Sequence, residues 1–268
     1  MGPFAAMLAM ATALLFAAGC DRKKSVAAPT ANSIGMIMAE IPAGSFRMGS
    51  IEEASQMPVH EVAIPRPFLI SATTVTQRQW EDVMGTAPWI GEGLTSAGIG
   101  PDCPAVNMTI EDAWEFCRRL GAMEGKNYRL PSEAEWEYSA RAGSTGLWFF
   151  GDSPDQLDRY AWHNGNSKSK GHVGAHPVAL LKPNPFGLYD VYGNVWELCE
   201  DNWQPNYNGA PTDSSAWRLG GKDSDRVMRG GSHHSTPQRA SSPSRINLVP
   251  SKPYENVGFR IVCDISKQ

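Results

Sequence analysis

One short segment carries residues that could bind a metal. Asp190 and Glu197 stand seven residues apart, with Gly193 and Asn194 between them. Two carboxylates separated by flexible glycine backbone can wrap an ion of the size of Ca²⁺ with side-chain and carbonyl oxygens. The segment therefore predicts a calcium site. The alternative is that Glu197 pairs with an arginine and Asp190 caps a turn.

A second group of polar residues lies about forty residues further on. Ser232, His233 and His234 are catalytic candidates, because a histidine can act as a general base near neutral pH. The competing interpretation is one surface histidine and one that is hydrogen-bonded in a loop. Neighbours on a strand point to opposite faces, so we do not expect both histidines to bind one metal unless the backbone turns.

Basic side chains surround these histidines. Arg229, Arg239 and Arg245, together with Ser235, form a candidate groove that could recognise a carboxylate or a phosphate. The arginines could equally pair with acidic side chains of the protein itself. The sequence leaves these two roles open.

The elements that must position these groups are short. Capping residues predict three helices: one over 76–84 behind Thr76, one that begins at Thr109 with Asp112 three residues on, and one capped by Ser132 with Glu135. Alternating residues predict a strand, a turn and a strand over 38–49, and further strands over 226–229 and 257–263. The 26 glycines and 20 prolines indicate many turns.

Bulk composition limits the function classes. The chain has 268 residues, a net charge of -4 and a pI of about 5.9, with both signs of charge interspersed. A nucleic-acid-binding protein would need a clustered basic face, so no nucleic-acid partner is expected. The length suits one folded domain with an N-terminal tail.

The N-terminus is typical of an export signal. Residues 1–19 carry no charge and end in small residues before Cys20, as in a bacterial lipoprotein signal. We expect cleavage before Cys20, lipid attachment to it, a tether over 20–35 and a domain over 36–266. The predicted location is the bacterial cell envelope, as a periplasm-facing lipoprotein. A secreted or soluble periplasmic protein is the alternative.

Export leaves four cysteines in the domain, and an even number suggests two disulfides in an oxidising compartment. No two of them form a Cys-x-x-Cys pair, so a zinc site is not expected. Four cysteines allow three pairings. They are Cys103, Cys117, Cys199 and Cys263.

Six strings occur in an order that resembles one family. They include Gly-Asn-Val-Trp-Glu at 193–197 and Arg-Gly-Gly-Ser at 229–232, and the others lie at 41–49, 129–138, 185–190 and 258–260. Together they resemble the formylglycine-generating enzyme, or sulfatase-modifying factor, family over residues 36 to 264. The resemblance implies an α+β fold of the C-type-lectin-like kind with little regular secondary structure.

The same resemblance implies ligands and disulfides. The calcium ligands would be the side chains of Asp190 and Glu197 and the backbone carbonyls of Gly193 and Val195, with a second, tentative site that starts at Asn166. A cysteine at the position of Cys117 pairs in relatives with one in the last strand. This implies Cys117–Cys263 and leaves Cys103–Cys199.

The resemblance also limits the chemistry. Aerobic oxidases of this family bind copper with two cysteines, three and eight residues after the Gly-Gly-Ser serine, because Cu(I) prefers thiolates. Here those positions are Ser235 and Ala240. Copper-dependent formylglycine generation is therefore not expected, and whether the chain is an enzyme stays open.

Two functions follow as hypotheses. The first is an envelope binding or regulatory module that takes a protein or peptide ligand. The alternative is a periplasmic oxidative tailoring enzyme of the pyoverdine-maturation type, which would act on a peptide or siderophore.

Overall fold

The computed structural model describes residues 30–91, 98–168, 174–221 and 224–265. The predicted signal at 1–19, Cys20 and the first part of the tether lie outside the described residues. Thr30 and Ala31, expected in the tether, already form a strand, so the sheet begins before the predicted boundary at residue 36. No helix within the described residues is both long and apolar enough to cross a membrane.

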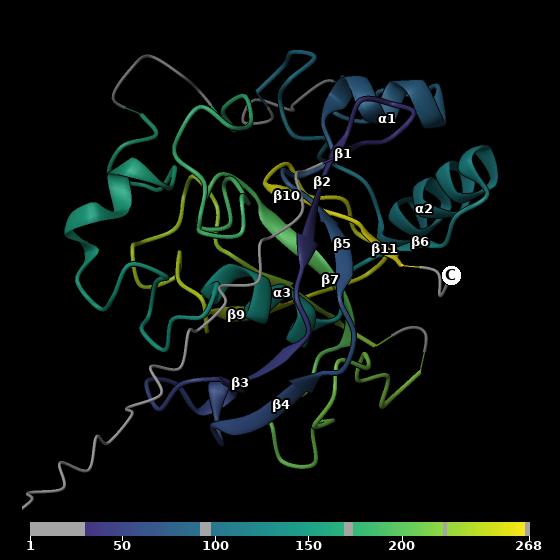
Figure 1. Cartoon of the computed structure of the whole chain (residues 1–268). Coiled ribbons are helices and arrows are strands. Elements are labelled where there is room, and N and C mark those ends of the chain that lie inside the picture. The colour runs from purple at the N-terminus through teal and green to yellow at the C-terminus, as the bar shows by residue number, and fades with distance from the viewer. Residues whose placement is uncertain (1–29, 92–97, 169–173, 222–223, 266–268) are drawn as a thin grey trace, which may run out of the picture.

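The largest sheet joins strands from both ends of the chain (Figure 1). In spatial order its strands are β1 (Thr30–Ala31), β2 (Ile37–Ile41), β5 (Phe68–Ser71), β11 (Val262–Asp264) and β6 (Tyr128–Arg129). The neighbouring strands all run antiparallel. Strands from the start and from the end of the described domain therefore belong to one sheet.

The second sheet carries the predicted site segments. Its order is β10 (Val257–Gly258), β7 (Trp196–Asn202), β8 (Arg226–Arg229) and β9 (Arg245–Leu248). Glu197 of β7 stands opposite Arg229 of β8 and beside Gly258 of β10. A separate hairpin pairs β3 (Gly44–Met48) with β4 (His60–Ile64). The strands predicted over 226–229 and 38–49 are confirmed, and 257–263 is split into β10 and β11.

All three predicted helices are confirmed with their caps. They are α1 (Gln77–Met84), α2 (Ile110–Glu124) and α3 (Glu133–Arg141), and each begins with a complete capping box on Thr76, Thr109 or Ser132. Two short 3₁₀ helices, Ala54–Gln56 and Pro154–Arg159, complete the helical structure of the described residues. Between α3 and β7 the described residues are otherwise turns and loops, as their glycine and proline content predicts.

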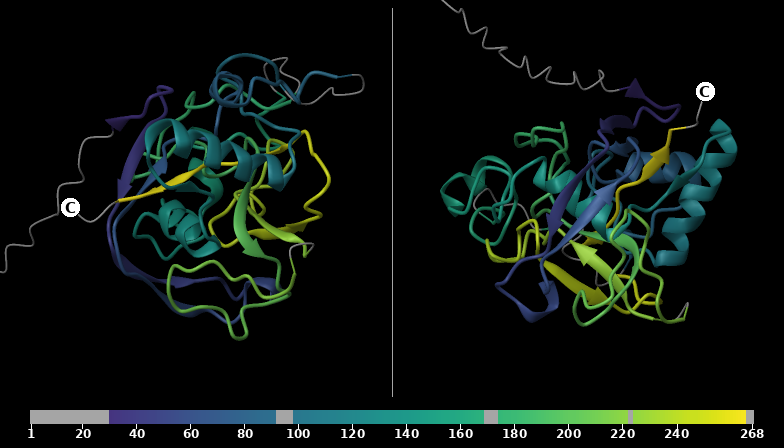
Figure 2. Two further views of the ribbon diagram at one scale, coloured as in Figure 1. Left: turned by 90° about the vertical axis from the view of Figure 1, so that its right-hand side faces the viewer. Right: turned by 60° about the horizontal axis from the view of Figure 1, so that its bottom comes forward.

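The helices differ in how they pack. α1 and α2 lie on one side of the molecule (Figure 1 and Figure 2). The rings of Trp80 and Phe116 stack with their centroids 5.8 Å apart, and both meet the ring of Phe259 edge-on. α3 lies near the centre (Figure 1), and every one of its residues is buried, including Glu133 and Glu137. Because buried carboxylates need partners, arginines from distant strands pack against the carboxylates of α3.

Candidate functional site

Asn194 joins three segments of the chain at the predicted site. It takes a left-handed backbone conformation with φ of 59° and is 1% exposed. Its backbone N–H donates to Trp162 O at 2.8 Å, and its side-chain amide exchanges hydrogen bonds with the backbone N–H and C=O of His176. Its own carbonyl accepts the backbone N–H of His233 at 2.8 Å. The 162, 176 and 233 segments therefore meet at this asparagine.

His233 is held as a neutral imidazole. Its ring Nδ1 lies 2.8 Å from Asn194 O, which can only accept, so Nδ1 carries the proton. Burial lowers the pKa of His233 to about 4, and the ring is 2% exposed. Its Nε2 is then a buried acceptor that has no hydrogen-bond partner among the described residues. An unpaired lone pair on a fixed, neutral imidazole has the form of a base or a ligand.

The expectation that His233 and His234 lie on a strand is wrong. β8 ends at Arg229, and the chain turns through Gly230 and Gly231, both at positive φ. The turn brings the two imidazole rings to 4.0 Å, with His233 buried and His234 exposed. One histidine is thus hydrogen-bonded in the loop and the other lies at the surface.

The serines near the histidines bind the loop itself. Ser235 Oγ accepts the backbone N–H of Ser232 at 2.9 Å, and Ser232 Oγ accepts from His234 N at 3.3 Å and Asn256 Nδ2 at 3.4 Å. Among the residues that the structure describes, no hydrogen bond joins Ser232 Oγ to an imidazole nitrogen. The geometry therefore does not pair this serine with a histidine as nucleophile and base.

The predicted arginine groove is wrong for two of its members. Arg229 is 0% exposed and donates to Glu137 and to backbone carbonyls. Arg245 is 1% exposed, and its guanidinium binds both carboxylate oxygens of Glu133 at 2.7 and 2.9 Å. Only Arg239 reaches the surface, 3.6 Å from Glu53. Buried guanidinium groups need carboxylate partners, so Arg229 and Arg245 form ion pairs inside the core.

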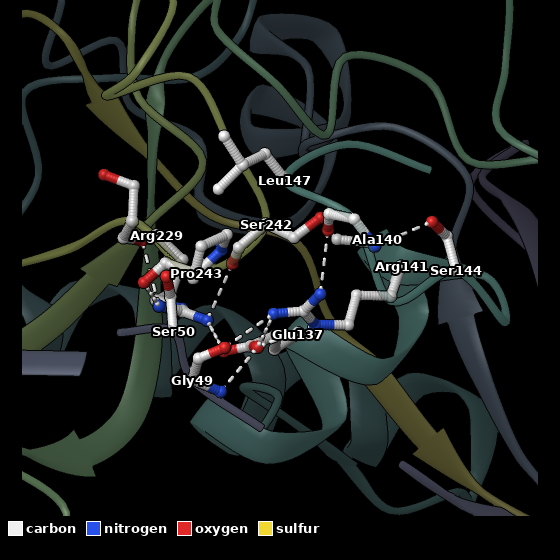
Figure 3. Close-up of polar contacts among 12 residues, drawn as sticks. Gly49, Ser50, Glu137, Ala140, Arg141, Ser144, Leu147, Arg229, Ser242 and Pro243 are labelled. Carbon is white, nitrogen blue, oxygen red and sulfur yellow. Dashed lines mark hydrogen bonds and ion pairs between the residues drawn. The ribbon is translucent and has the colours of Figure 1, made fainter. Parts of the chain in front are cut away.

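Glu137 shows most clearly how a buried carboxylate pairs with arginines (Figure 3). Its carboxylate lies between Arg141 and Arg229 and also accepts the backbone N–H of Gly49 at 2.9 Å. Burial opposes ionisation, but the two guanidinium groups lower the pKa of Glu137 below its ordinary value. A cavity of about 460 Å³, lined by Gly49, Arg141 and Pro243, lies beside this cluster. Arg141 also binds Gly49 O and Gly146 O, so it offers this cavity no free donor pair.

The predicted calcium segment fits a cation only in part. Both oxygens of Glu197 accept from Arg260 at 2.6 Å, and Oε2 also accepts from Trp136 Nε1 at 2.6 Å. Glu197 is 0% exposed, so Arg260 and Trp136, and not water, surround its carboxylate. To bind calcium, Glu197 would have to leave Arg260. Of the two roles that the sequence left open, the structure has the arginine pair.

Asp190 fits a cation better. Its Oδ2 accepts the backbone N–H of Ala179 at 2.8 Å, which closes a turn, while Oδ1 is buried without a partner. Burial raises the pKa of Asp190 to about 6. Asn166, the tentative second site, uses its amide to bind His163 N and Ala161 O. No group of three or more His, Cys, Asp or Glu side chains in the described ranges is arranged for a metal.

The cysteines differ from the expectation. All four are buried free thiols, so neither Cys117–Cys263 nor Cys103–Cys199 is formed in the structure. Cys199 lies on β7 among the charges of Asp201, Glu133 and Arg229, whereas Cys103 lies near Gly100 and Asp102. Cys117 and Cys263 share one hydrophobic cluster, but Cys263 Sγ is directed at Asp264 O at 3.8 Å.

Several residues at the site were missed from the sequence. Arg260 and Trp136 complete the Glu197 cluster, and His176 stacks on Trp162 at 3.8 Å beside Asn194. One signal was available for Asn194. An asparagine that follows glycine in a turn-rich segment favours a left-handed backbone, which exposes its carbonyl to another segment.

Comparisons with known proteins agree with this geometry. The model of the sulfatase-modifying factor enzyme 1-like domain matches residues 23–265. The formylglycine-generating enzyme of Streptomyces coelicolor is 30% identical, over 84% of this chain and 88% of its own. The chaperone protein LppX of Paenibacillus barcinonensis is 29% identical, over 57% of this chain and 67% of its own.

A solved structure agrees as well. The structure of PvdO from Pseudomonas aeruginosa is 31% identical, covers 90% of this chain and all of that chain, and superposes with a TM-score of 0.81. This likeness confirms the α+β fold expected from the six strings. The matched domain and the shared fold together show that the chain belongs to the formylglycine-generating enzyme, or sulfatase-modifying factor, family.

Proposed function

We propose that this protein is an exported, lipid-anchored member of its family that binds a protein or peptide in the bacterial cell envelope, without copper oxidase chemistry. The observation that carries the proposal is the pair of residues at 235 and 240. Soft Cu(I) needs thiolates, and these positions hold Ser235, which caps the turn at Ser232, and Ala240, which is 0% exposed.

The surroundings of Ala240 support this proposal. Its backbone carbonyl accepts the indole N–H of Trp148 at 2.5 Å, so this position serves packing. Cys199 and Cys263, which lie on β7 and β11, are buried thiols. The similarity to a protein named as a chaperone favours a binding role over an oxidase role.

The test has two parts. Purified protein with a cysteine-containing sulfatase peptide and Cu(I) should neither consume oxygen nor form formylglycine, while an active family member run in parallel should do both. In the bacterium the wild-type chain should fractionate with membranes, and Cys20→Ala should release it. Oxygen-dependent formylglycine formation by this chain would overturn the proposal.

One observation favours a second function. The unpaired, buried Nε2 of His233 is the form that a general base needs, as an oxidative tailoring enzyme acting on a peptide or siderophore would use. Turnover of such a substrate that His233→Ala abolishes and His234→Ala leaves intact would establish this alternative. Loss of turnover in both variants would point to the loop as a whole.

Calcium stays a proposal that rests on Asp190. Its unpaired Oδ1 is a hard oxygen donor, and the carbonyls of Gly193 and Val195 belong to the same segment. Calorimetry on chelator-stripped protein tests it. Binding that Asp190→Ala removes would support the ion, and no heat of binding at millimolar Ca²⁺ would exclude it.

A further inference from the structure

A sizeable cavity in the described part of the chain lies away from the histidine loop. Its volume is about 810 Å³, within the range of roughly 300–1,000 Å³ that encloses small ligands. The β1–β2 hairpin forms one wall, and the start of α1 and the turns around 178 and 186 form the others. Most of the lining is aliphatic or aromatic: Ile34, Ile37, Ala39, Val178, Pro185 and Phe186.

The walls are fixed by buried hydrogen bonds. The carboxylate of Asp190 holds the backbone of Ala179, and Tyr189 N donates to Ala72 O, both at 2.8 Å. Asn184 Oδ1 accepts from the backbone N–H groups of Phe186 and Leu188 at 3.0 Å. Because these partners are internal to the protein, the cavity is formed before any ligand binds.

The interior suits a hydrocarbon chain. On the helix side, the side-chain oxygens of Thr76 and Gln79 accept the reciprocal bonds of the α1 capping box. A peptide backbone would bring N–H and C=O groups that need partners when buried. A hydrocarbon chain brings none, and it gains free energy from each apolar area that it removes from water.

The charged residues of the lining carry both signs. Arg78 supplies a guanidinium group, and Glu40 and Asp102 supply two carboxylates. No ion pair joins these side chains to one another or to other residues that the structure describes. Arg78 and Asp102 are exposed and Glu40 is half-buried, so the three groups mark the rim of the cavity. A head group with one negative and one positive charge complements this rim.

We propose that this cavity binds a single-chain zwitterionic phospholipid of the lysophosphatidylethanolamine class. Its acyl chain fills the apolar interior between Ile37 and Phe186. Its phosphate pairs with Arg78, since a guanidinium group matches phosphate oxygens. Its ammonium group lies at Glu40 and Asp102.

The position of the cavity matches a source of such a lipid, and this step rests on the proposed lipid anchor. The hairpin wall is the first described element of the domain, and ten residues join Thr30 to Cys20. At most about 3.6 Å per residue, this tether keeps Thr30, at the start of the hairpin wall, within roughly 36 Å of a membrane in which Cys20 is anchored. The bilayer would then supply the ligand.

Calorimetry with palmitoyl lysophosphatidylethanolamine, below its micelle concentration, tests the site on the exported chain carrying Cys20→Ser. We expect one molecule per chain. Ile37→Asp should weaken binding at least about tenfold, because it places a carboxylate among the apolar walls. Ile90→Asp is the matched control, since Ile90 is another exposed isoleucine and lies outside this cavity.

A second pair of variants tests the head group. Arg78→Gln should weaken binding of the lysolipid and leave binding of monopalmitin, which lacks the phosphate, unchanged. Arg66→Gln, at an exposed arginine outside the cavity lining, should change neither. Absence of saturable binding, or equal binding by the Ile37→Asp and Ile90→Asp variants, would overturn the proposal. Binding of an apolar peptide in place of the lysolipid would assign the cavity to a peptide. Membrane fractionation of the wild-type chain is scored separately, so a missing anchor leaves this result interpretable.

Discussion

The carboxylates around α3 and the histidine of the loop after β8 are equally buried, but they are paired to different degrees. Glu133, Glu137 and Glu197 each lie against at least one arginine, and their carboxylate oxygens accept several donors. His233 Nε2 accepts none. Buried polar groups that are saturated stabilise a fold, whereas an unpaired one in a fixed ring is available for function. The predictions below test this contrast.

The largest effect should come from breaking a saturated pair. Arg260→Ala would leave the Glu197 carboxylate buried without its cation, with Trp136 Nε1 still bonded to it, which costs about 3–5 kcal/mol of the free energy of unfolding. Urea denaturation measures it. Arg118→Ala, whose side chain is 68% exposed beside Glu115, should cost far less, because water screens this pair. Similar losses in the two variants would contradict the assigned role of the buried pair.

Asn194 should rank next. Asn194→Ala removes two side-chain hydrogen bonds and leaves the backbone N–H and C=O of His176 buried, which costs roughly 2 kcal/mol. Thermal or urea unfolding checks this value. Asn247→Ala is the control, because the exposed Asn247 side chain donates to Asp225 at 2.6 Å, and the loss should stay within about 0.5 kcal/mol.

His233 should give the molecule a pH dependence. Its pKa is lowered from 6.5 to about 4 on folding, so the unfolded chain binds a proton first and stability is lost as pH falls from about 6.5 to about 4. His233→Asn should remove that slope. The raised pKa of Asp201, about 7, acts in the opposite direction, so the difference between wild type and variant reports the histidine. Parallel curves for the two proteins would show that His233 does not titrate in this range.

The smallest effect should come from the arginine that lies at the surface. Arg239 and Glu53 are 45% and 41% exposed and 3.6 Å apart, so Arg239→Ala should change the free energy of unfolding by less than about 1 kcal/mol. The same measurement on Arg245→Ala should give a loss several times larger, because Glu133 would lose its bidentate partner. Equal losses would erase the distinction between the two arginines.

Local signals in the sequence predicted the elements well. The helix starts at Thr76, Thr109 and Ser132 depend on a residue only three positions away, so each capping box can be found without knowledge of the fold. The partners of the buried carboxylates could not be found this way. Arg260 pairs with Glu197 across 63 residues, and Arg245 with Glu133 across 112.

The turn before the histidines could be predicted from the sequence only in part. Gly230 and Gly231 both take positive φ, and a Cβ on Gly231 would lie 2.8 Å from Arg239 O. Two consecutive glycines after a strand indicate a turn, and this signal could have replaced the expected strand at 233–234. Which histidine the turn buries depends on Asn194, 39 residues earlier, and no local pattern contains that contact.

The position of β11 in the larger sheet affects how the protein folds during synthesis. This strand separates β5 from β6 in the larger sheet, yet it follows every other described strand along the chain. Until Val262–Asp264 has left the ribosome, β5 and β6 have no common neighbour and this sheet stays open. A chain built in this way cannot complete its larger sheet until its last described strand arrives.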